Sequence, residues 1–203
     1  MARIAILDYG SGNLHSVSRA IAKVGGDVDV TSDPSRVASA DALVIPGVGH
    51  FGQCVRALAD RGLDRAASAF AATGRPVVGV CVGLQVLFDA SDEDAVAGMG
   101  VLGGRVRRLP DRQKVPHMGW NTVRWVREHP YTAGIDDGSY FYFVHSFAPD
   151  VDDDTAVGVT GYGRPFASVV ARDNVFATQF HPEKSGEVGL QLYENVVKTV
   201  ASQ

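Results

Sequence analysis

The sequence has few cysteines, no long apolar run and no excess of basic charge. Cys54 and Cys81 are its only cysteines, which excludes a disulfide framework and favours a reducing compartment. No apolar stretch is long enough to span a bilayer. The net charge of −4, from 19 basic and 23 acidic residues, does not indicate a binding surface for nucleic acid or an anionic membrane. The one short basic run, Arg105 to Arg108, is expected on a solvent-facing strand.

Metal-ligand spacing and a nucleotide-binding loop are also missing. Five histidines show no ligand spacing with another His, Cys or carboxylate cluster: His15, His50, His117, His129 and His145. The loop Asp8 to Asn13 follows an apolar segment, but it lacks the Walker Lys and a full G-x-G-x-x-G pattern. We therefore expect neither a metal nor a cofactor.

Strand and helix signals alternate in the first half of the chain. Ile4 to Leu7, Val28 to Thr31 and Ala42 to Ile45 are short apolar segments, and Asn13 to Val24 has a helical pattern. Near-continuous apolar strands are what a parallel sheet with helices on both faces requires. Beyond about residue 100 the strands alternate and become aromatic. The pattern predicts a three-layer α/β domain with a mixed, mostly parallel sheet.

Two further helical segments and a tight turn complete this prediction. Phe51 to Ala72 should be helical with a break near Gly62, and Gly186 to Val200 should form a closing amphipathic helix. Asp173-Asn174 is expected to turn the chain into the strand Val175 to Phe180. With 203 residues and 45% hydrophobic residues, the chain should form a single domain over residues 1–203. Because the chain starts with a strand pattern rather than a signal-peptide pattern, we expect a cytoplasmic protein.

A cysteine stands where a strand should turn sharply into a helix. Gly79-Val80-Cys81-Val82-Gly83 follows an apolar run and precedes the apolar segment Leu84 to Phe88. Glycines on both sides allow the tight turn that exposes a nucleophile, as in the G-x-S-x-G elbow of hydrolases. Unpaired N–H groups at the start of the helix would favour a thiolate and could bind an oxyanion. The alternative is a cysteine buried in a core strand.

A histidine near the C-terminus provides the base that such a nucleophile needs. Gln179-Phe180-His181-Pro182-Glu183 ends another apolar run, so His181 and its carboxylate neighbour Glu183 come from one short loop. A thiol needs a base to take its proton, and the base needs an orienting carboxylate. Both motifs lie at the ends of predicted strands, where open α/β sheets place their sites.

Two other segments are candidates for the same site. Pro46-Gly47-Val48-Gly49 ends the third predicted strand, and the N–H of Val48 could join that of Val82 to bind an oxyanion. A plain turn is the alternative. Gln85 lies one helical turn after Cys81 and could hydrogen-bond a substrate amide or carboxylate.

Together these motifs resemble the class I (triad) glutamine amidotransferases. That resemblance rests on Pro46 to Gly49, on Gly79 to Gly83 with Gln85, and on His181 to Glu183. Within this group the chain is similar to the glutaminase subunit of imidazole glycerol phosphate synthase over four more segments, which are Asp8 to Leu14, Pro116 to Asn121, Phe143 to Phe147 and Gln179 to Ser185. The resemblance covers essentially the whole chain.

The resemblance implies a class I glutamine amidotransferase-like (flavodoxin-like) domain that hydrolyses glutamine to glutamate and ammonia. Cys81 would attack the carboxamide, His181 would transfer protons, and Glu183 would orient His181. Backbone N–H groups around Gly47, Val48 and Val82 would form the oxyanion hole. The residues implied to bind glutamine are Gly49, Gln85, Glu93, Ser146 and Phe147.

The resemblance also implies a partner that uses the ammonia. A cyclase, which is a (β/α)8 barrel, would receive it within a heterodimer and form imidazole glycerol phosphate and AICAR in histidine biosynthesis. Asn13, Trp120 and Lys184 are the candidates for the contact surface. One alternative is a binding module that has lost turnover, and the intact Cys81, His181 and Glu183 argue against it. Another is the glutaminase of a different enzyme, such as anthranilate synthase, and the Trp120 motif and Lys184-Ser185 argue against that one.

Overall fold

The computed structural model describes residues 2–202 and contains one large sheet, one small sheet and helices on both faces of the large sheet. The strands are β1 (Arg3–Leu7), β2 (Asp27–Thr31), β3 (Ala42–Gly47), β4 (Val77–Cys81), β5 (Phe88–Ser91), β6 (Leu102–Arg108), β7 (His117–Trp125), β8 (Ser139–His145), β9 (Phe147–Pro149), β10 (Ala156–Tyr162), β11 (Arg164–Arg172) and β12 (Val175–Thr178). The helices are α1 (Leu14–Lys23), α2 (Pro34–Ala38), α3 (Phe51–Asp60), α4 (Leu63–Ala71), α5 (Val82–Gln85) and α6 (Gly186–Ala201), with 3-10 turns η1 (Pro130–Thr132) and η2 (Pro182–Lys184).

The large sheet has a parallel half and an antiparallel half. Its strand order is β2-β1-β3-β4-β12-β11-β10-β7-β8. The first five strands in this order pair in parallel, and each later strand pairs antiparallel with its neighbour. The mixed sheet predicted from the sequence is confirmed. The small sheet, with strand order β5-β6-β9, lies beside it.

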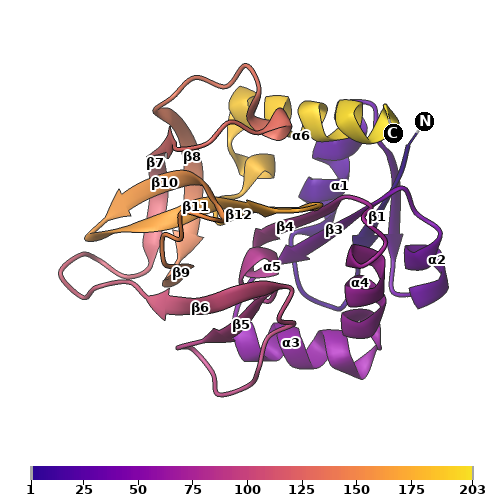
Figure 1. Ribbon diagram of the computed structural model, residues 1–203, viewed down its shortest axis with the longest axis horizontal. Coiled ribbons are helices and arrows are strands. Elements are labelled where there is room, and N and C mark those ends of the chain that lie inside the picture. The colour runs from indigo at the N-terminus through magenta and orange to yellow at the C-terminus, as the bar shows by residue number, and fades with distance from the viewer. Residues whose placement is uncertain (1, 203) are drawn as a thin grey trace.

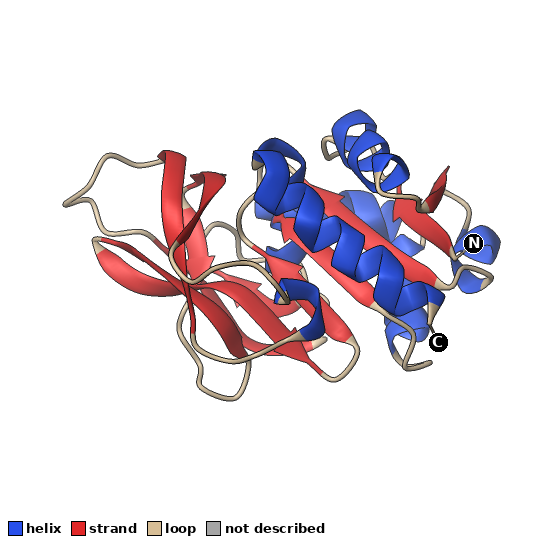
Figure 2. Ribbon diagram, turned by 90° about the horizontal axis from the view of Figure 1, so that it is seen from above, coloured by secondary structure: helices blue, strands red, loops and turns tan. Residues whose placement is uncertain are grey.

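Helices cover both faces of the parallel half. Figure 1 shows α1 and α6 on one side of the sheet, and α3 and α4 on the other side with α2 packed beside α4. In Figure 2 the helices enclose the parallel strands, whereas the antiparallel strands extend away from them. The three-layer architecture is therefore confirmed, and the apolar strands β1, β3 and β4 are buried because a helical layer covers each face.

The predicted breaks in the chain occur where backbone geometry requires them. α3 ends at Asp60 and α4 begins at Leu63, with Gly62 between them at φ +67°, a conformation that favours glycine. Asp173 takes a φ of 51° in the turn between β11 and β12. By contrast, α5 is a single turn of four residues, and Phe88 already begins β5. The segment Leu84 to Phe88 is thus less helical than its sequence indicated.

The register of the parallel strands brings the candidate site residues to one edge of the sheet. Gly47 at the end of β3 lies opposite Cys81 at the end of β4. On the other side of β4, Thr178 of β12 lies opposite Val80. His181 follows three residues later, so the loop after β12 meets the elbow after β4. This edge is where open α/β sheets place their sites.

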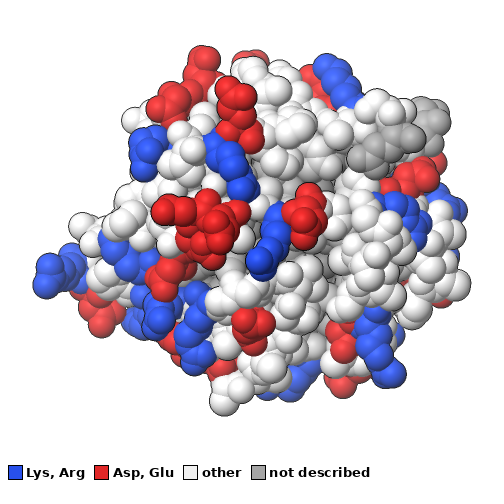
Figure 3. Space-filling view, in the orientation of Figure 1, with Lys and Arg blue, Asp and Glu red and all other residues white. Residues whose placement is uncertain are grey.

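The surface carries charges of both signs, and they are interspersed on the face seen in Figure 3. In the basic run on β6, Arg105 pairs with Asp92 at 2.8 Å and Arg107 with Asp150 at 2.5 Å. These arginines are exposed, as the sequence predicted for a solvent-facing strand. Within residues 2–202 no helix has the length and apolar character to cross a membrane. The same residues contain no group of three or more His, Cys, Asp or Glu side chains that could hold a metal ion.

Candidate active site

Cys81 occupies a strained backbone position between β4 and α5. Its φ and ψ are 56° and −112°, and it is one of two non-glycine residues with positive φ among those described. A residue held in such a conformation costs of order 1–3 kcal/mol, and strain of this kind clusters at functional sites. The side chain is nearly buried, with Sγ 3.9 Å from the Val144 carbonyl oxygen and 3.8 Å from the Nε2 of Gln179. The elbow predicted from the sequence is therefore present.

Two glycines allow the elbow to form against the end of β3. A Cβ on Gly83 would overlap the carbonyl oxygen of Ile45. A Cβ on Gly47 would lie 2.5 Å from the backbone nitrogen of Gly83, which is too close for any side chain. The oxyanion candidates Gly47 and Val82 are thereby held beside each other, at the edge where Cys81 emerges.

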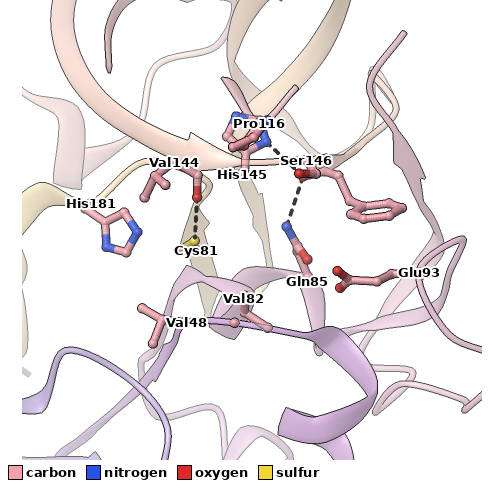
Figure 4. A pocket seen from close by; sticks show the side chains of 12 residues that line it. Val48, Cys81, Val82, Gln85, Glu93, Pro116, Val144, His145, Ser146 and His181 are labelled. Atoms are coloured by element: carbon pink, nitrogen blue, oxygen red, sulfur yellow. Dashed lines mark hydrogen bonds between the residues drawn. The ribbon is translucent and has the colours of Figure 1, made fainter. Parts of the chain in front are cut away.

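His181 faces the cysteine from the loop after β12, with Glu183 behind it. The Nδ1 of His181 lies 2.8 Å from the Oε1 of Glu183, and both side chains are almost completely buried. The backbone of His181 is fixed because its N–H donates to the Tyr142 carbonyl at 3.0 Å and its carbonyl accepts from the Ser185 hydroxyl at 2.7 Å. The Nε2 of His181 has no hydrogen-bond partner among the described residues, and Figure 4 shows the ring beside Cys81.

The charges around His181 favour its protonated form. Burial alone would lower the pKa of His181, but the negative charge of Cys81, followed by the hydrogen bond and charge of Glu183, raises this pKa to about 10. A protonated imidazole beside the sulfur is the arrangement in which a cysteine reacts as a thiolate.

A pocket of about 240 Å³ opens in front of the sulfur. It brings together nine residues that the sequence assigned to the site, and these are Val48, Gly49, Cys81, Val82, Gln85, Glu93, Ser146, Phe147 and His181. Two assigned residues lie just outside it. Glu183 is behind His181, and Gly47 packs against Gly83.

The end of the pocket away from Cys81 is lined by hydrogen-bond acceptors. The Nε2 of Gln85 donates to the Phe147 carbonyl at 3.0 Å and to the Oε1 of Gln179 at 3.1 Å. Both hydrogens of the Gln85 amide are thus used, and its Oε1 remains available as an acceptor. The Glu93 carboxylate, which accepts from the N–H of Phe51 at 2.7 Å, lies across from it in Figure 4. An acceptor pair of this kind suits a ligand ammonium group.

The loop after β3 is tied to the segment that follows β1. The Tyr9 hydroxyl donates to the Pro46 carbonyl, and the Ser11 hydroxyl donates to the Val48 carbonyl at 2.7 Å. Cys54, on α3, lies 3.4 Å from the Ser11 oxygen and 3.6 Å from the Val48 carbonyl oxygen. The backbone of the oxyanion candidate Val48 is therefore anchored through its carbonyl.

The three residues assigned to a partner surface occupy different places around the triad. The Nδ2 of Asn13 donates to the Oε1 of Glu183 at 3.4 Å, so Asn13 contacts the triad itself. Trp120 on β7 is 56% exposed, and its ring lies 6.1 Å from that of Tyr142 on β8. The Nζ of Lys184 is 5.8 Å from the same Tyr142 ring.

Sequence reasoning missed residues whose roles depend on distant contacts. It gave His145 no role, although this ring lines the pocket and its Nδ1 lies 2.9 Å from the Phe147 carbonyl. It also gave no role to Gln179, which connects Gln85 to the sulfur of Cys81. The only signal for Gln179 was its place at the end of a strand two residues before His181.

Comparison with known proteins identifies the family. The family model described as "Glutamine amidotransferase class-I" matches residues 5–199 of this chain. A protein named imidazole glycerol phosphate synthase subunit HisH from Symbiobacterium thermophilum is 49% identical over 197 residues, which cover 96% of this chain and 93% of that protein. The protein of the same name from Dechloromonas aromatica is 50% identical over 207 residues, which cover 96% of this chain and 95% of that protein. The chain belongs to the class-I glutamine amidotransferases, among the HisH subunits.

Solved structures support the same fold in this family. A crystal structure of a glutamine amidotransferase superposes with a TM-score of 0.76 at 16% identity and covers 97% of this chain and 98% of that one. The structure of PurLQS from Thermotoga maritima superposes with a TM-score of 0.73 at 19% identity and covers 98% of this chain and 99% of that one. HisH relatives therefore determine which subgroup the chain resembles, and these structures show only the fold.

Proposed function

We propose that this chain hydrolyses glutamine to glutamate and ammonia, with Cys81 as the nucleophile. The observation that carries the proposal is the position of Cys81 on a strained elbow, facing a buried His181 that is paired with Glu183. Cys81, His181 and Glu183 are thus arranged in space as the nucleophile, base and orienting carboxylate of covalent catalysis. The match with the class-I glutamine amidotransferases and with HisH proteins supports glutamine as the substrate.

The reaction follows from the chemistry of the three side chains. The Cys81 thiolate attacks the carboxamide carbon of glutamine, and the oxygen of the resulting tetrahedral intermediate carries the negative charge. His181 gives its proton to the departing nitrogen, which leaves as ammonia, and a thioester remains on Cys81. His181 then takes a proton from water, whose oxygen attacks the thioester, and glutamate leaves as the thiolate is restored. Glu183 keeps the ring of His181 oriented throughout.

The pocket walls have separate roles in this reaction. Backbone N–H groups around Gly47, Val48 and Val82 stabilise the oxyanion next to Cys81. At the far end, the Gln85 Oε1 and the Glu93 carboxylate bind the α-ammonium group of glutamine. The backbone at Gly49, Ser146 and Phe147 completes the wall that holds the substrate's amino-acid end.

The ammonia passes to a second subunit. Free ammonia would be protonated and lost in water, and the HisH relatives are named as subunits of imidazole glycerol phosphate synthase. We infer a cytoplasmic heterodimer with a cyclase, a (β/α)8 barrel that forms imidazole glycerol phosphate and AICAR in histidine biosynthesis.

The exposed face of the β7–β8 pair is the candidate docking surface for this cyclase. Met118, Trp120 and Tyr140 are 63%, 56% and 61% exposed, and they lie beside Tyr142 and Lys184. Aromatic and Met side chains are enriched in interfaces, and exposed apolar side chains that cluster in this way mark binding surfaces. Asn13 extends the surface toward Glu183.

Cys81→Ala tests the proposal in the complex with a candidate cyclase. The variant should lose glutamine hydrolysis, because the nucleophile is gone, but should still support synthesis from added ammonium salt. Cys54→Ser is the matched control, since Cys54 is the other buried thiol, does not line the pocket, and serine keeps a polar atom beside Ser11 and the Val48 carbonyl. Glutamine hydrolysis at the wild-type rate by Cys81→Ala would exclude Cys81 as the nucleophile. Binding without turnover in the wild-type complex would instead favour a non-catalytic module.

A further inference from the structure

Two buried histidines, one in the pocket wall and one behind it, form a continuous hydrogen-bond chain. His117 on β7 and His145 on β8 lie directly opposite each other in the antiparallel pair. The Nδ1 of His145 is 2.9 Å from the Phe147 carbonyl oxygen, and its Nε2 is 3.1 Å from the Nδ1 of His117. The Nε2 of His117 lies 3.3 Å from the Nδ2 of Asn121. Each ring nitrogen therefore has one polar neighbour.

The chemistry of these atoms fixes the direction of every bond in the chain. A carbonyl oxygen only accepts, so the Nδ1 of His145 must carry a hydrogen. The Nε2 of a neutral His145 then accepts, and the hydrogen between the two rings belongs to the Nδ1 of His117. The Nε2 of His117 accepts in turn from Asn121, whose amide is oriented because it also donates to the Gly161 carbonyl at 3.1 Å and accepts from the N–H of Thr122 at 2.8 Å.

Burial keeps both rings in the neutral form that this pattern needs. Burial lowers the pKa of His117 to about 4 and, as the largest influence, lowers that of His145 to about 3. A proton on the Nε2 of His145 would also place two donors against each other. The rings are stacked among apolar aromatics, with the His117 ring centroid 4.9 Å from that of Phe143 and 4.0 Å from that of Tyr162.

The chain ends at the group that orients Gln85. The Phe147 carbonyl accepts one bond from His145 and another from the Gln85 amide, and Figure 4 shows these meeting at the pocket wall. With its other hydrogen on Gln179, Gln85 can present only its Oε1 to the pocket. If the Phe147 carbonyl moved, Gln85 would lose the bond that determines which end of its amide faces the substrate.

We propose that His117 and His145 are positioning residues that hold the Phe147 carbonyl, and through it the Gln85 amide, in the orientation that binds the amino-acid end of glutamine. This inference rests on the proposed glutaminase function and assigns roles to two residues that touch neither the reacting carboxamide nor Cys81. Phenylalanine at either position would keep the stacking and lose the bonds. The histidines are thus needed for their directed hydrogen bonds rather than for packing.

Steady-state glutaminase kinetics of the complex with a cyclase separate this role from packing. His145→Phe should raise the KM for glutamine about tenfold, the effect of losing one to two hydrogen bonds, with a much smaller change in kcat. His145→Asn keeps a donor at the δ position and should restore most of the affinity. His129→Phe is the matched control, because His129 is half-buried, its ring lies 4.8 Å from that of Phe176 in a tilted arrangement, and it does not line the pocket. An unchanged KM in folded His145→Phe, or an equal rise in His145→Asn, would overturn the proposal.

A second measurement needs no turnover. Long-range ¹H–¹⁵N correlation spectra of the wild-type chain at neutral pH should show His117 and His145 both as neutral Nδ1–H tautomers. In His117→Asn, which keeps the δ donor toward His145, the His145 signal should stay in this form. An Nε2–H tautomer at either ring in the wild-type chain would overturn the proposal even if the kinetics agreed. Because the spectra do not depend on glutamine, they can fail while the glutaminase function stands. A wild-type complex without glutaminase activity would refute the proposed function, and with it the role in binding glutamine, even if the spectra showed the hydrogen-bond chain intact.

Discussion

The Nδ1 of His181 lies 2.8 Å from the Oε1 of Glu183, in a position where neither side chain reaches solvent. Because a carboxylate only accepts, this bond places a hydrogen on Nδ1 and leaves Nε2 directed at the cysteine. The bond also connects the triad to the surface, since Asn13 at the start of α1 donates to the same carboxylate oxygen.

Glu183→Gln should sharply reduce turnover without a comparable loss of glutamine affinity. The amide keeps the size of the side chain but removes the charge that stabilises a protonated His181, and Glu183 makes no contact with the pocket. Loss of an orienting carboxylate in a catalytic triad costs up to about 10⁴ in kcat, so a fall of at least about a hundredfold is expected. The measurement is kcat and KM for glutamine in the complex, with the exposed Glu187→Gln as control. A kcat equal to that of the control would place Glu183 outside the mechanism.

The titration of His181 should depend on Cys81. Removal of the sulfur in Cys81→Ala takes away the strongest influence that raises the pKa of His181, which should then titrate well below the value of about 10 in the wild-type chain. The Nδ1 bond to Glu183 still opposes the effect of burial. The chemical shifts of the His181 ring, followed by NMR across pH 5 to about 10, measure this difference. Titration curves that coincide in the two proteins would contradict this prediction.

The same shift has a consequence for stability. Because the folded pKa of His181 lies above the unfolded value of about 6.5, its contribution to the free energy of unfolding is fully present below that pH and is lost as pH rises through about 10. An unfolded cysteine loses its own proton at about pH 8.5, so below that pH the folded pair and the unfolded chain bind equal numbers of protons at these two residues. Between about 8.5 and about 10 the wild-type chain should therefore lose more stability than Cys81→Ala. Urea unfolding at several pH values tests this, and a steeper loss in the variant would contradict it.

The sequence predicted what local patterns determine and missed what distant contacts determine. The elbow at Cys81 was predictable, because two flanking glycines after an apolar strand have few other uses, and the loop at His181 followed from the same strand-end rule. The single-turn α5 was not, since an apolar run such as Leu84 to Phe88 suits a short helix and a strand equally.

Contacts between remote segments left no trace in local sequence patterns. Asn13 and Glu183 are 170 positions apart, and His117 and His145 are 28 apart. Asn13, His117 and His145 look ordinary within their own segments. The tertiary fold alone determines that the two histidines face each other across β7 and β8, and that Asn13 reaches the triad.

Gly83→Ala should destabilise the fold and remove activity together. The added methyl group would collide with the Ile45 carbonyl oxygen, which is backbone and cannot move aside as a flexible side chain would. Forcing a methyl group into a packed interior costs about 1–3 kcal/mol, and here it also displaces the elbow that carries Cys81. Gly161→Ala is the matched control, because a Cβ at Gly161 on β10 meets nothing within 4 Å. Urea unfolding and glutaminase rates measure both effects, and equal stability of the two variants would show that the elbow tolerates a side chain.

Tyr193→Phe and Tyr9→Phe should have opposite effects on stability although both rings are buried. The Tyr193 hydroxyl, on α6, has no hydrogen-bond partner among the described residues, and burial followed by the charge of Glu183 raises its pKa well above the usual value. Its removal should leave the free energy of unfolding unchanged or raise it by about 1 kcal/mol. The Tyr9 hydroxyl donates to the Pro46 carbonyl, so Tyr9→Phe leaves a buried acceptor without its donor and should cost about 1–3 kcal/mol.

Glutaminase kinetics of the same two variants distinguish a structural hydroxyl from one that supports the site. Pro46 precedes the oxyanion candidates Gly47 and Val48, so Tyr9→Phe should also lower kcat, whereas Tyr193→Phe should retain the wild-type rate. If Tyr193→Phe instead lost activity at unchanged stability, its hydroxyl would have to act on Glu183, whose Oε2 is likewise buried without a partner among the described residues. An unchanged free energy of unfolding in Tyr9→Phe would show that the hydrogen bond to Pro46 contributes nothing to stability.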